Sequence, residues 1–385
     1  MAATPLFFDH NSSTPVSPRV ERRMLEVLHQ FYGNPHSQTH RHGWNAASLI
    51  SELSYSISSY FSASLHTVFT SGATEANNLA FNLKFPSERP NVLIGPLEHS
   101  AVEEPALRLA QKLGGELITI PCDEEGYIDL GFVTDELLAS CAIVSVSFAS
   151  GEIGTIQTKL ERLRDKAKQS GVWFHSDMSQ ALQHPQARLF GSECDAISIS
   201  GHKIYGPQGV GALVVNEQFR NALEPILIGG GQQDGIRAGT MPTFLCAGFA
   251  EALIETSDWI ESGASADLTD RVRFFFKMLE AEIGIRYSES IEIIGPTTFT
   301  DRVPGNLTVR LPKGLDASDL LMASSATFSA SQGSACHSGQ ETASSSLRAI
   351  GITDRDARRV IRFGLGRNTS HQNIETVVGT LAGLI

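Results

Sequence analysis

One lysine stands at the end of a predicted strand. Lys203 lies in the segment SGHKIYGP, residues 200–207, directly after DAISIS, whose alternation of apolar and small residues predicts a half-buried strand. Desolvation at such a place favours the neutral amine, and a neutral amine attacks carbonyl groups to form Schiff bases. The alternative is a lysine whose ammonium group reaches water along its own aliphatic stem.

Two other segments combine a strand end with suitable chemistry. TSGATEANN, residues 70–78, follows a predicted strand and opens a helix, and small residues there let backbone N–H groups bind an anion. Asp177 ends the apolar strand VWFHSD, where a carboxylate needs a positive partner such as a protonated ring nitrogen. An ordinary strand-to-helix turn and a helix cap are the structural alternatives. An anion cradle, a buried acid and a reactive lysine are together what pyridoxal 5′-phosphate requires for its phosphate, its pyridinium nitrogen and its aldehyde.

The elements that must position these groups follow a regular order. Between about residues 67 and 215, short β-branched runs alternate with helical segments, which predicts an α/β architecture with a mostly parallel sheet. Ligands of such sheets bind at the carboxyl ends of the strands. Apolar residues at helical spacing after Pro18 predict one helix packed on the core: Val20, Met24, Val27, Leu28 and Phe31. Downstream of the predicted sheet, SDWIESGASADLTDRVRFFFKMLEAEIG predicts a helical connection with a glycine-containing break. We therefore expect a large domain over residues 15–257 and a smaller α+β domain formed by residues 1–14 and 258–385.

Composition narrows the class of protein. The 385 residues carry 30 basic and 42 acidic side chains, a net charge of −12, which disfavours nucleic acid and anionic membranes as partners. The sequence contains no run of 18 apolar residues, so no transmembrane helix is predicted. The start MAATPLFFDHNSSTP does not resemble a signal peptide. Five scattered cysteines without a CxxC pair indicate reduced thiols and a cytoplasmic protein. His36, His40 and His42 match no standard ligand spacing, so no metal site is expected.

Motifs along the chain make the comparison specific. Because these motifs occur in the same order as in that family, the chain resembles the NifS/IscS-type cysteine desulfurases. They belong to the class V aminotransferase group of fold-type I enzymes that use pyridoxal 5′-phosphate. The motifs that carry the resemblance span about residues 6–370: FFDHNSSTPVSPRV, YGNPHSQTHRHG, VFTSGATEANNLA, LEHSAV, GEIGTIQ, SDMSQAL, SISGHKIYGPQGVGAL, GGGQQDGIRAGT, SQGSACHSG and IRFGLGR. The combination of SGHKIYGP with a later GSAC is the most specific part.

The resemblance implies a role for each matching position. Lys203 would form the Schiff base with the cofactor and move the substrate's proton. The other cofactor contacts would be Asp177 at the pyridinium, Gln180 at the phenolic oxygen, His99 stacked on the ring and active in proton transfer, and Ala73, Thr74, Ser200 and His202 at the phosphate. Thr240 would reach the phosphate in the other subunit of a homodimer. Arg362 would clamp the substrate carboxylate in bidentate fashion, with Asn34 at the same end.

Cys336 would complete the reaction. It lies in SASQGSACHSG, a Ser/Gly-rich segment that predicts a mobile loop with an exposed thiolate, whereas Cys122, Cys141, Cys194 and Cys246 are interpreted as structural. The resemblance implies that L-cysteine becomes L-alanine and that its sulfur forms a persulfide on Cys336. An acceptor protein would then take the sulfur toward iron–sulfur cluster assembly, tRNA thiolation or DNA phosphorothioation.

Three positions depart from the family pattern. Gly151 stands where the family has an asparagine that contacts cofactor or substrate. Met178 stands where a small alanine packs on the ring, and its polarizable side chain is expected to stack on the ring or tilt it. Gln232 and Gln233 replace a pair that usually contains glutamate. Three alternatives stay open: a selenocysteine lyase, a C–S lyase that does not need the loop thiol, and a catalytically impaired scaffold or sulfur-carrier partner.

Overall fold

A seven-stranded mixed sheet forms the centre of the computed structural model, which describes residues 4–84, 88–284, 287, 289–332, 334–335 and 342–385. The strand order is β2–β8–β7–β6–β5–β3–β4. These strands are β2 (His66–Thr70), β3 (Asn91–Ile94), β4 (Leu117–Thr119), β5 (Cys141–Ser145), β6 (Trp173–Asp177), β7 (Ala196–Ser200) and β8 (Gly211–Val215). Within this sheet, β8 pairs antiparallel to β2 and β7, whereas the other pairs are parallel. The predicted mostly parallel α/β sheet is therefore confirmed.

Both faces of the sheet are buried under helices. Successive strand residues alternate between two hydrophobic clusters: Val144 packs in one and Ile143 in the other, as expected from the two-residue period of a strand. The first cluster includes side chains from α1 (Pro18–Gln30), α2 (Arg41–Phe61), α6 (Leu160–Gln169), α7 (Ala187–Gly191) and α9 (Thr243–Glu261). The second includes side chains from α3 (Ala73–Ala80), α4 (Ser100–Leu113) and α8 (Glu217–Ala222). Burial on both faces explains why these strands are apolar almost throughout.

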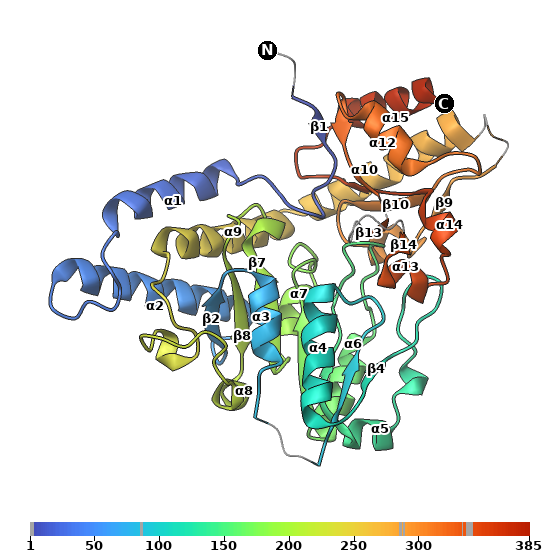
Figure 1. Cartoon of the computed structure of the whole chain (residues 1–385). Helices are drawn as coiled ribbons and strands as arrows, with labels where there is room; N and C mark the ends of the chain where they lie inside the picture. The colour runs from blue at the N-terminus through green and yellow to red at the C-terminus, as the bar shows by residue number, and fades with distance from the viewer. Residues whose placement is uncertain (1–3, 85–87, 285–286, 288, 333, 336–341) are drawn as a thin grey trace.

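A smaller sheet brings the two ends of the chain together. Its order is β12 (Ser331–Gln332), β15 (Val360–Gly364), β10 (Asn306–Arg310) and β9 (Glu292–Ile293), with antiparallel pairing. Near the amino terminus, β1 (Leu6–Phe7) pairs with β11 (Phe328–Ser329), so the blue start of the chain lies among the orange and red elements in Figure 1. A separate cluster joins Phe8 to apolar residues between Leu268 and Leu381.

The remaining elements surround these two sheets. They are α5 (Asp135–Ala139), α10 (Ala264–Leu279), α12 (Ala317–Ser324), α13 (Ser345–Ala349), α14 (Asp354–Ala357) and α15 (His371–Leu384), the pair β13 (Ser334–Ala335) and β14 (Thr342–Ala343), and the short turns η1 (Leu130–Phe132), η2 (Gly201–Lys203), η3 (Gln233–Gly235), η4 (Glu280–Gly284) and η5 (Phe299–Asp301). The predicted glycine break lies between α9 and α10, where Gly263 has a left-handed φ of 80°. The proposed boundary at residue 257 falls inside α9, and it stays a prediction.

The predicted helix after Pro18 is confirmed as α1, although its buried face is narrower than expected. Ser17 caps the helix by accepting from the backbone N–H of Val20, and Val20 and Val27 are buried. Leu28, in contrast, is 46% exposed. Among the described residues, no helix is long and apolar enough to cross a membrane.

Candidate active site

A cavity of about 950 Å³ opens at the carboxyl ends of the central parallel strands. Its wall combines strand ends, the start of α3 and α4, the amino-terminal segment around Asn11, and residues of the small sheet and of α13. Nine of the predicted site residues line it: Ala73, Thr74, His99, Asp177, Gln180, Ser200, His202, Lys203 and Arg362. The topology explains the gathering, because neighbouring parallel strands end at one edge of the sheet.

Lys203 lies in η2, directly after β7, and its amine points to the amino-terminal segment. Its Nζ donates to the carbonyl oxygens of Asn11 and Ser12, both at 2.8 Å. Burial, assisted by the positive charge of Arg362, lowers the pKa of Lys203 to about 8. A larger fraction of neutral amine is therefore present near neutral pH than for a lysine in water, as a Schiff-base lysine requires.

This lowered pKa predicts when the amine of the apoprotein becomes reactive. A lysine reacts as the free base, so labelling of Lys203 by an amine-directed reagent should rise with a midpoint near pH 8, against 10.5 for an unperturbed lysine. Replacing Arg362 with methionine removes a repelling charge and should move this midpoint upward. Competitive labelling, read by peptide mass spectrometry across pH, measures both values. A midpoint near 10.5 in the wild-type chain would contradict the burial argument.

Asp177 is held in place at the end of β6 by two donors. Its Oδ2 accepts from Asn77 Nδ2 at 2.7 Å and its Oδ1 from the backbone N–H of Ser179 at 2.9 Å. Asn77 is fully buried in α3, and its Oδ1 has no hydrogen-bond partner among the residues that the structure describes. The carboxylate is thus oriented toward the cavity by neighbours on both sides.

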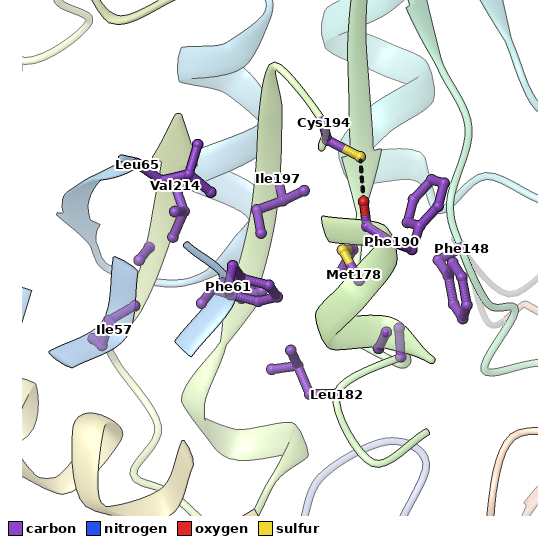
Figure 2. Packing of buried hydrophobic residues seen from close by; sticks show 14 of the residues in the cluster. Ile57, Phe61, Leu65, Phe148, Met178, Leu182, Phe190, Cys194, Ile197 and Val214 are labelled. Carbon is purple, nitrogen blue, oxygen red and sulfur yellow. Dashed lines mark hydrogen bonds between the residues drawn. The ribbon is translucent and has the colours of Figure 1, made fainter. Parts of the chain in front are cut away.

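Met178 lies in the hydrophobic core, not in the cavity wall where a contact with the cofactor ring was expected. Figure 2 shows it among Phe61, Phe190 and Ile197, and its side chain is 0% exposed. The reason is the alternation of side chains along an extended chain: Asp177 faces the cavity, so the next residue faces the core. Ser179, two positions after Asp177, lines the cavity instead, with a buried Oγ that has no hydrogen-bond partner in the described part of the chain. The same alternation could have identified Ser179 from the sequence.

The start of α3 provides the anion cradle. Gly72 is its N-cap residue and makes no side-chain capping hydrogen bond, so the first backbone N–H groups of the helix receive no cap from this residue. Ala73 and Thr74 lie at this end, and Ser200, His202 and Gln208 line the cavity with them. Burial and the charge of Lys203 lower the pKa of His202 to about 4, so this imidazole is neutral at neutral pH.

Arg362, in β15, already faces a carboxylate of its own chain. Its Nη2 lies 2.9 Å from Asp9 Oδ1, and its Nη1 donates to the carbonyl oxygen of Gly151 at 3.4 Å. Its buried Nε has no hydrogen-bond partner within residues 4–84, 88–284, 287, 289–332, 334–335 and 342–385. The guanidinium thus retains donor capacity toward the cavity, and Asp9 sets its position.

Two acids in the cavity wall, Glu98, which is buried, and Glu152, which is half-buried, were not identified from the sequence. Glu98, 4% exposed, accepts from Ser147 at both the backbone N–H and the hydroxyl group, and burial raises its pKa to about 7. Glu152 accepts from the hydroxyl group of Ser344, and burial raises its pKa too. Beside Glu98, His99 caps α4, with its Nδ1 accepting from the backbone N–H of Ala101 at 3.0 Å. Neither acid stands out in the sequence, because their burial comes from distant parts of the chain.

Other predicted residues lie away from this cavity. Thr240 and Asn34 are exposed, and neither lines it. Gln233 pairs with both backbone polar groups of Phe69 on the edge strand β2, and Gln232 accepts from the N–H of Gly239, so both glutamines hold loop structure together. Cys336 lies outside the described residues; β13 and β14 flank residues 336–341.

The four described cysteines are free thiols, and none of them lines the cavity. Burial raises the pKa of Cys122 and Cys141 to about 11 and that of Cys246 to about 12, and it raises the pKa of Cys194 as well. Such thiols stay protonated at neutral pH and are poor nucleophiles. Within the described part of the chain, no group of three or more histidine, cysteine, aspartate or glutamate residues could hold a metal ion.

The donor set of the cavity fits pyridoxal 5′-phosphate. An amine with a lowered pKa suits the aldehyde, a buried carboxylate suits the pyridinium, and an uncapped helix start with nearby Ser200 suits the phosphate. The Oγ of Ser179, which no described residue contacts by a hydrogen bond, is one further polar group available to a bound molecule.

Known proteins with similar sequences and folds place the chain in a family. The model of the family described as aminotransferase class-V matches residues 6–377. A cysteine desulfurase IscS of Rickettsia rickettsii (strain Iowa) is 34% identical over 385 residues, covering 99% of this chain and 91% of the relative. The structure of a NifS-like protein superposes with a TM-score of 0.85 at 24% identity, covering 99% of both chains. The structure of DndA from Streptomyces lividans has a TM-score of 0.72 at 30% identity, covering 92% of this chain and 97% of that one.

Proposed function

The chain belongs to the class-V aminotransferase family as a cysteine desulfurase of the NifS/IscS type that depends on pyridoxal 5′-phosphate, and we propose that it releases the sulfur of L-cysteine as a persulfide on Cys336. The observation that carries this proposal is the cavity itself. One wall brings together a reactive lysine, a buried carboxylate, an uncapped helix start and a partly free guanidinium.

The residues of the cavity divide into two groups. Asp177 would hold the pyridinium, Ala73, Thr74, Ser200 and His202 the phosphate, Gln180 the phenolic oxygen, and His99 the face of the ring. When bound, the cofactor supplies an electron sink that makes the Cα–H bond of an amino acid acidic. Lys203 would accept that proton at Nζ, because its lowered pKa leaves much of the amine neutral near pH 8. Arg362 would bind the substrate carboxylate at the other end of the cavity.

Cys336 is the proposed nucleophile toward the substrate sulfur. Gln332 and Thr342, which precede and follow it in the chain, both line the cavity. Its thiolate would form an S–S bond to the substrate sulfur as the substrate Cβ–S bond breaks, leaving alanine as the organic product. The elevated pKa values of the four described cysteines support the choice of Cys336.

Replacing Cys336 with alanine should abolish the persulfide and reduce alanine formation from L-cysteine by on the order of 10³-fold, since the proposed nucleophile is lost and none of the four described cysteines lines the cavity. Incubation with L-cysteine, with alanine quantified and the persulfide mapped by peptide mass spectrometry, measures both. Cys122→Ala is the control, because this partly exposed thiol lies outside the cavity. Unchanged sulfur release in Cys336→Ala would instead support a C–S lyase. Loss of activity on L-cysteine with retained activity on L-selenocysteine would support a selenocysteine lyase.

The partners of this reaction are also proposals. We infer a homodimer in which Thr240 acts on the other subunit's site, since it is exposed and does not line the cavity of its own chain. Large apolar side chains are exposed as well, among them Tyr32 at 70%, Trp44 at 56% and Ile228 at 86%, and a subunit interface would cover such residues. Sedimentation should give twice the chain mass of 41.6 kDa, and a mass of one chain at micromolar concentration would contradict the dimer.

A sulfur-acceptor protein would take the persulfide sulfur, and the free thiols are consistent with the reducing environment of a cytoplasm. A catalytically impaired scaffold is the less favoured alternative, because the donor set for cofactor and substrate is present in the cavity. A purified protein that stays colourless with added pyridoxal 5′-phosphate would support the scaffold.

A further inference from the structure

Gly151 occupies a position where space, and not backbone conformation, requires a glycine. It is half-buried in the cavity wall, and its φ is not in the left-handed region. An added Cβ would lie 2.4 Å from Cδ and 2.5 Å from Nε2 of Gln180. These separations are far below van der Waals contact, so any side chain at position 151 must displace the Gln180 amide.

The Gln180 amide is fixed beside the catalytic lysine. Its Nε2 donates to the carbonyl oxygen of Asn11 at 2.8 Å, and the same oxygen accepts from Lys203 Nζ at 2.8 Å. A displaced Gln180 would therefore lose this hydrogen bond, and the carbonyl oxygen of Asn11 would accept from Lys203 Nζ only.

Gly151 also contacts Arg362, at the end of the cavity where the substrate carboxylate is proposed to bind. Its carbonyl oxygen accepts from Arg362 Nη1 at 3.4 Å and from Asn306 Nδ2 at 3.2 Å. Gly151 thus lies between the amide of Gln180 and the guanidinium of Arg362, and both line the same cavity.

We propose that Gly151 is a positioning residue: by lacking a side chain, it lets the Gln180 amide dock on Asn11 and keeps the space between Lys203 and Arg362 open for the amino-acid substrate. This inference rests on the proposed desulfurase function. It makes Gly151 and Gln180 a sterically coupled pair, in which the effect of a change at one position depends on the other.

A double-mutant cycle tests the coupling. Gly151→Ala should raise KM for L-cysteine about tenfold with a smaller change in kcat, because a displaced Gln180 enters the substrate space. In a Gln180→Ala background, the same change should raise KM less than about twofold, because the clashing side chain is gone. Gly379→Ala is the matched control: its added Cβ meets no atom within 4 Å, and KM should not change.

A second readout does not depend on activity. In the apoprotein, Gly151→Ala should lower Tm by a few degrees in the wild-type background and not in the Gln180→Ala background. Equal effects of Gly151→Ala in both backgrounds, on KM or on Tm, would overturn the proposal. If the wild-type enzyme released no sulfur from L-cysteine, the proposed function would fail, and the Tm cycle would still decide whether Gly151 positions Gln180.

Discussion

Replacing Lys203 with alanine is expected to reduce alanine formation from L-cysteine by on the order of 10³-fold or more, since the nucleophile and the proton acceptor are lost together. The amine is the basic group that the fold buries at the end of β7, and its two backbone acceptors, Asn11 and Ser12, hold it inside the cavity. The covalent attachment of the cofactor to this lysine should vanish as well. Borohydride reduction followed by peptide mapping measures the attachment, and a coupled alanine assay measures the rate.

A matched control separates chemistry from folding in this experiment. Lys166 also donates its Nζ to a backbone carbonyl, that of Val133, but it does not line the cavity. Lys166→Ala should therefore leave the rate and the attachment site unchanged, whatever it does to stability. If borohydride still fixed the cofactor to the Lys203→Ala chain at another lysine with the rate retained, Lys203 would not be the catalytic amine.

Replacing Asp177 with asparagine is expected to lower kcat/KM by roughly 10²- to 10³-fold, the range for loss of one partner of a buried charge pair. Asparagine has nearly the same shape and leaves the packing of β6 intact, but it carries no charge to hold a protonated ring nitrogen. It also turns one acceptor into a donor that faces Asn77 Nδ2 or the N–H of Ser179. Titration of the apoprotein with pyridoxal 5′-phosphate, followed by visible absorbance, should show a higher Kd together with the slower rate.

Asp195 offers a control of the same chemistry at the other end of the sheet. Its carboxylate also accepts from an asparagine amide, Asn216 Nδ2 at 2.7 Å, and from a backbone N–H, that of Phe174 at 2.8 Å. It does not line the cavity. Asp195→Asn should cost stability and leave the cofactor's Kd unchanged. Equal losses of cofactor affinity in Asp177→Asn and Asp195→Asn would mean that Asp177 acts only through the stability of the fold.

Local pattern was enough to identify the residues whose surroundings are set by their own strand. Lys203 and Asp177 each end an apolar run, and parallel strands end at one edge of a sheet, so both were expected in one site and both line the cavity. The expectation for the next residue rested on the family resemblance and not on this strand pattern. Met178 was expected at the cofactor ring, although side-chain alternation after Asp177 places it in the core and Ser179 in the cavity wall.

Contacts between segments that are distant in the sequence could not be predicted from local strand pattern. Asp9, Asn11 and Ser12 lie about 190 residues or more from the side chains they hold, Lys203 and Arg362, and no spacing rule relates them. Glu98 and Glu152 resemble surface acids in the sequence, and only packing by other parts of the chain buries Glu98, half-buries Glu152 and raises the pKa values of both.

The glycine at position 151 separates what the sequence determines from what only the tertiary structure decides. The sequence already determines that no side chain is present there, that a lysine and an acid end two apolar strands, and that a cysteine lies in a Ser/Gly-rich segment. Only the tertiary structure decides that the missing side chain makes room for Gln180 and that Asp9 holds Arg362 in place. The physical reason is that strand periodicity and turn chemistry act over a few residues, whereas steric fit and desolvation depend on whatever the whole chain brings into contact.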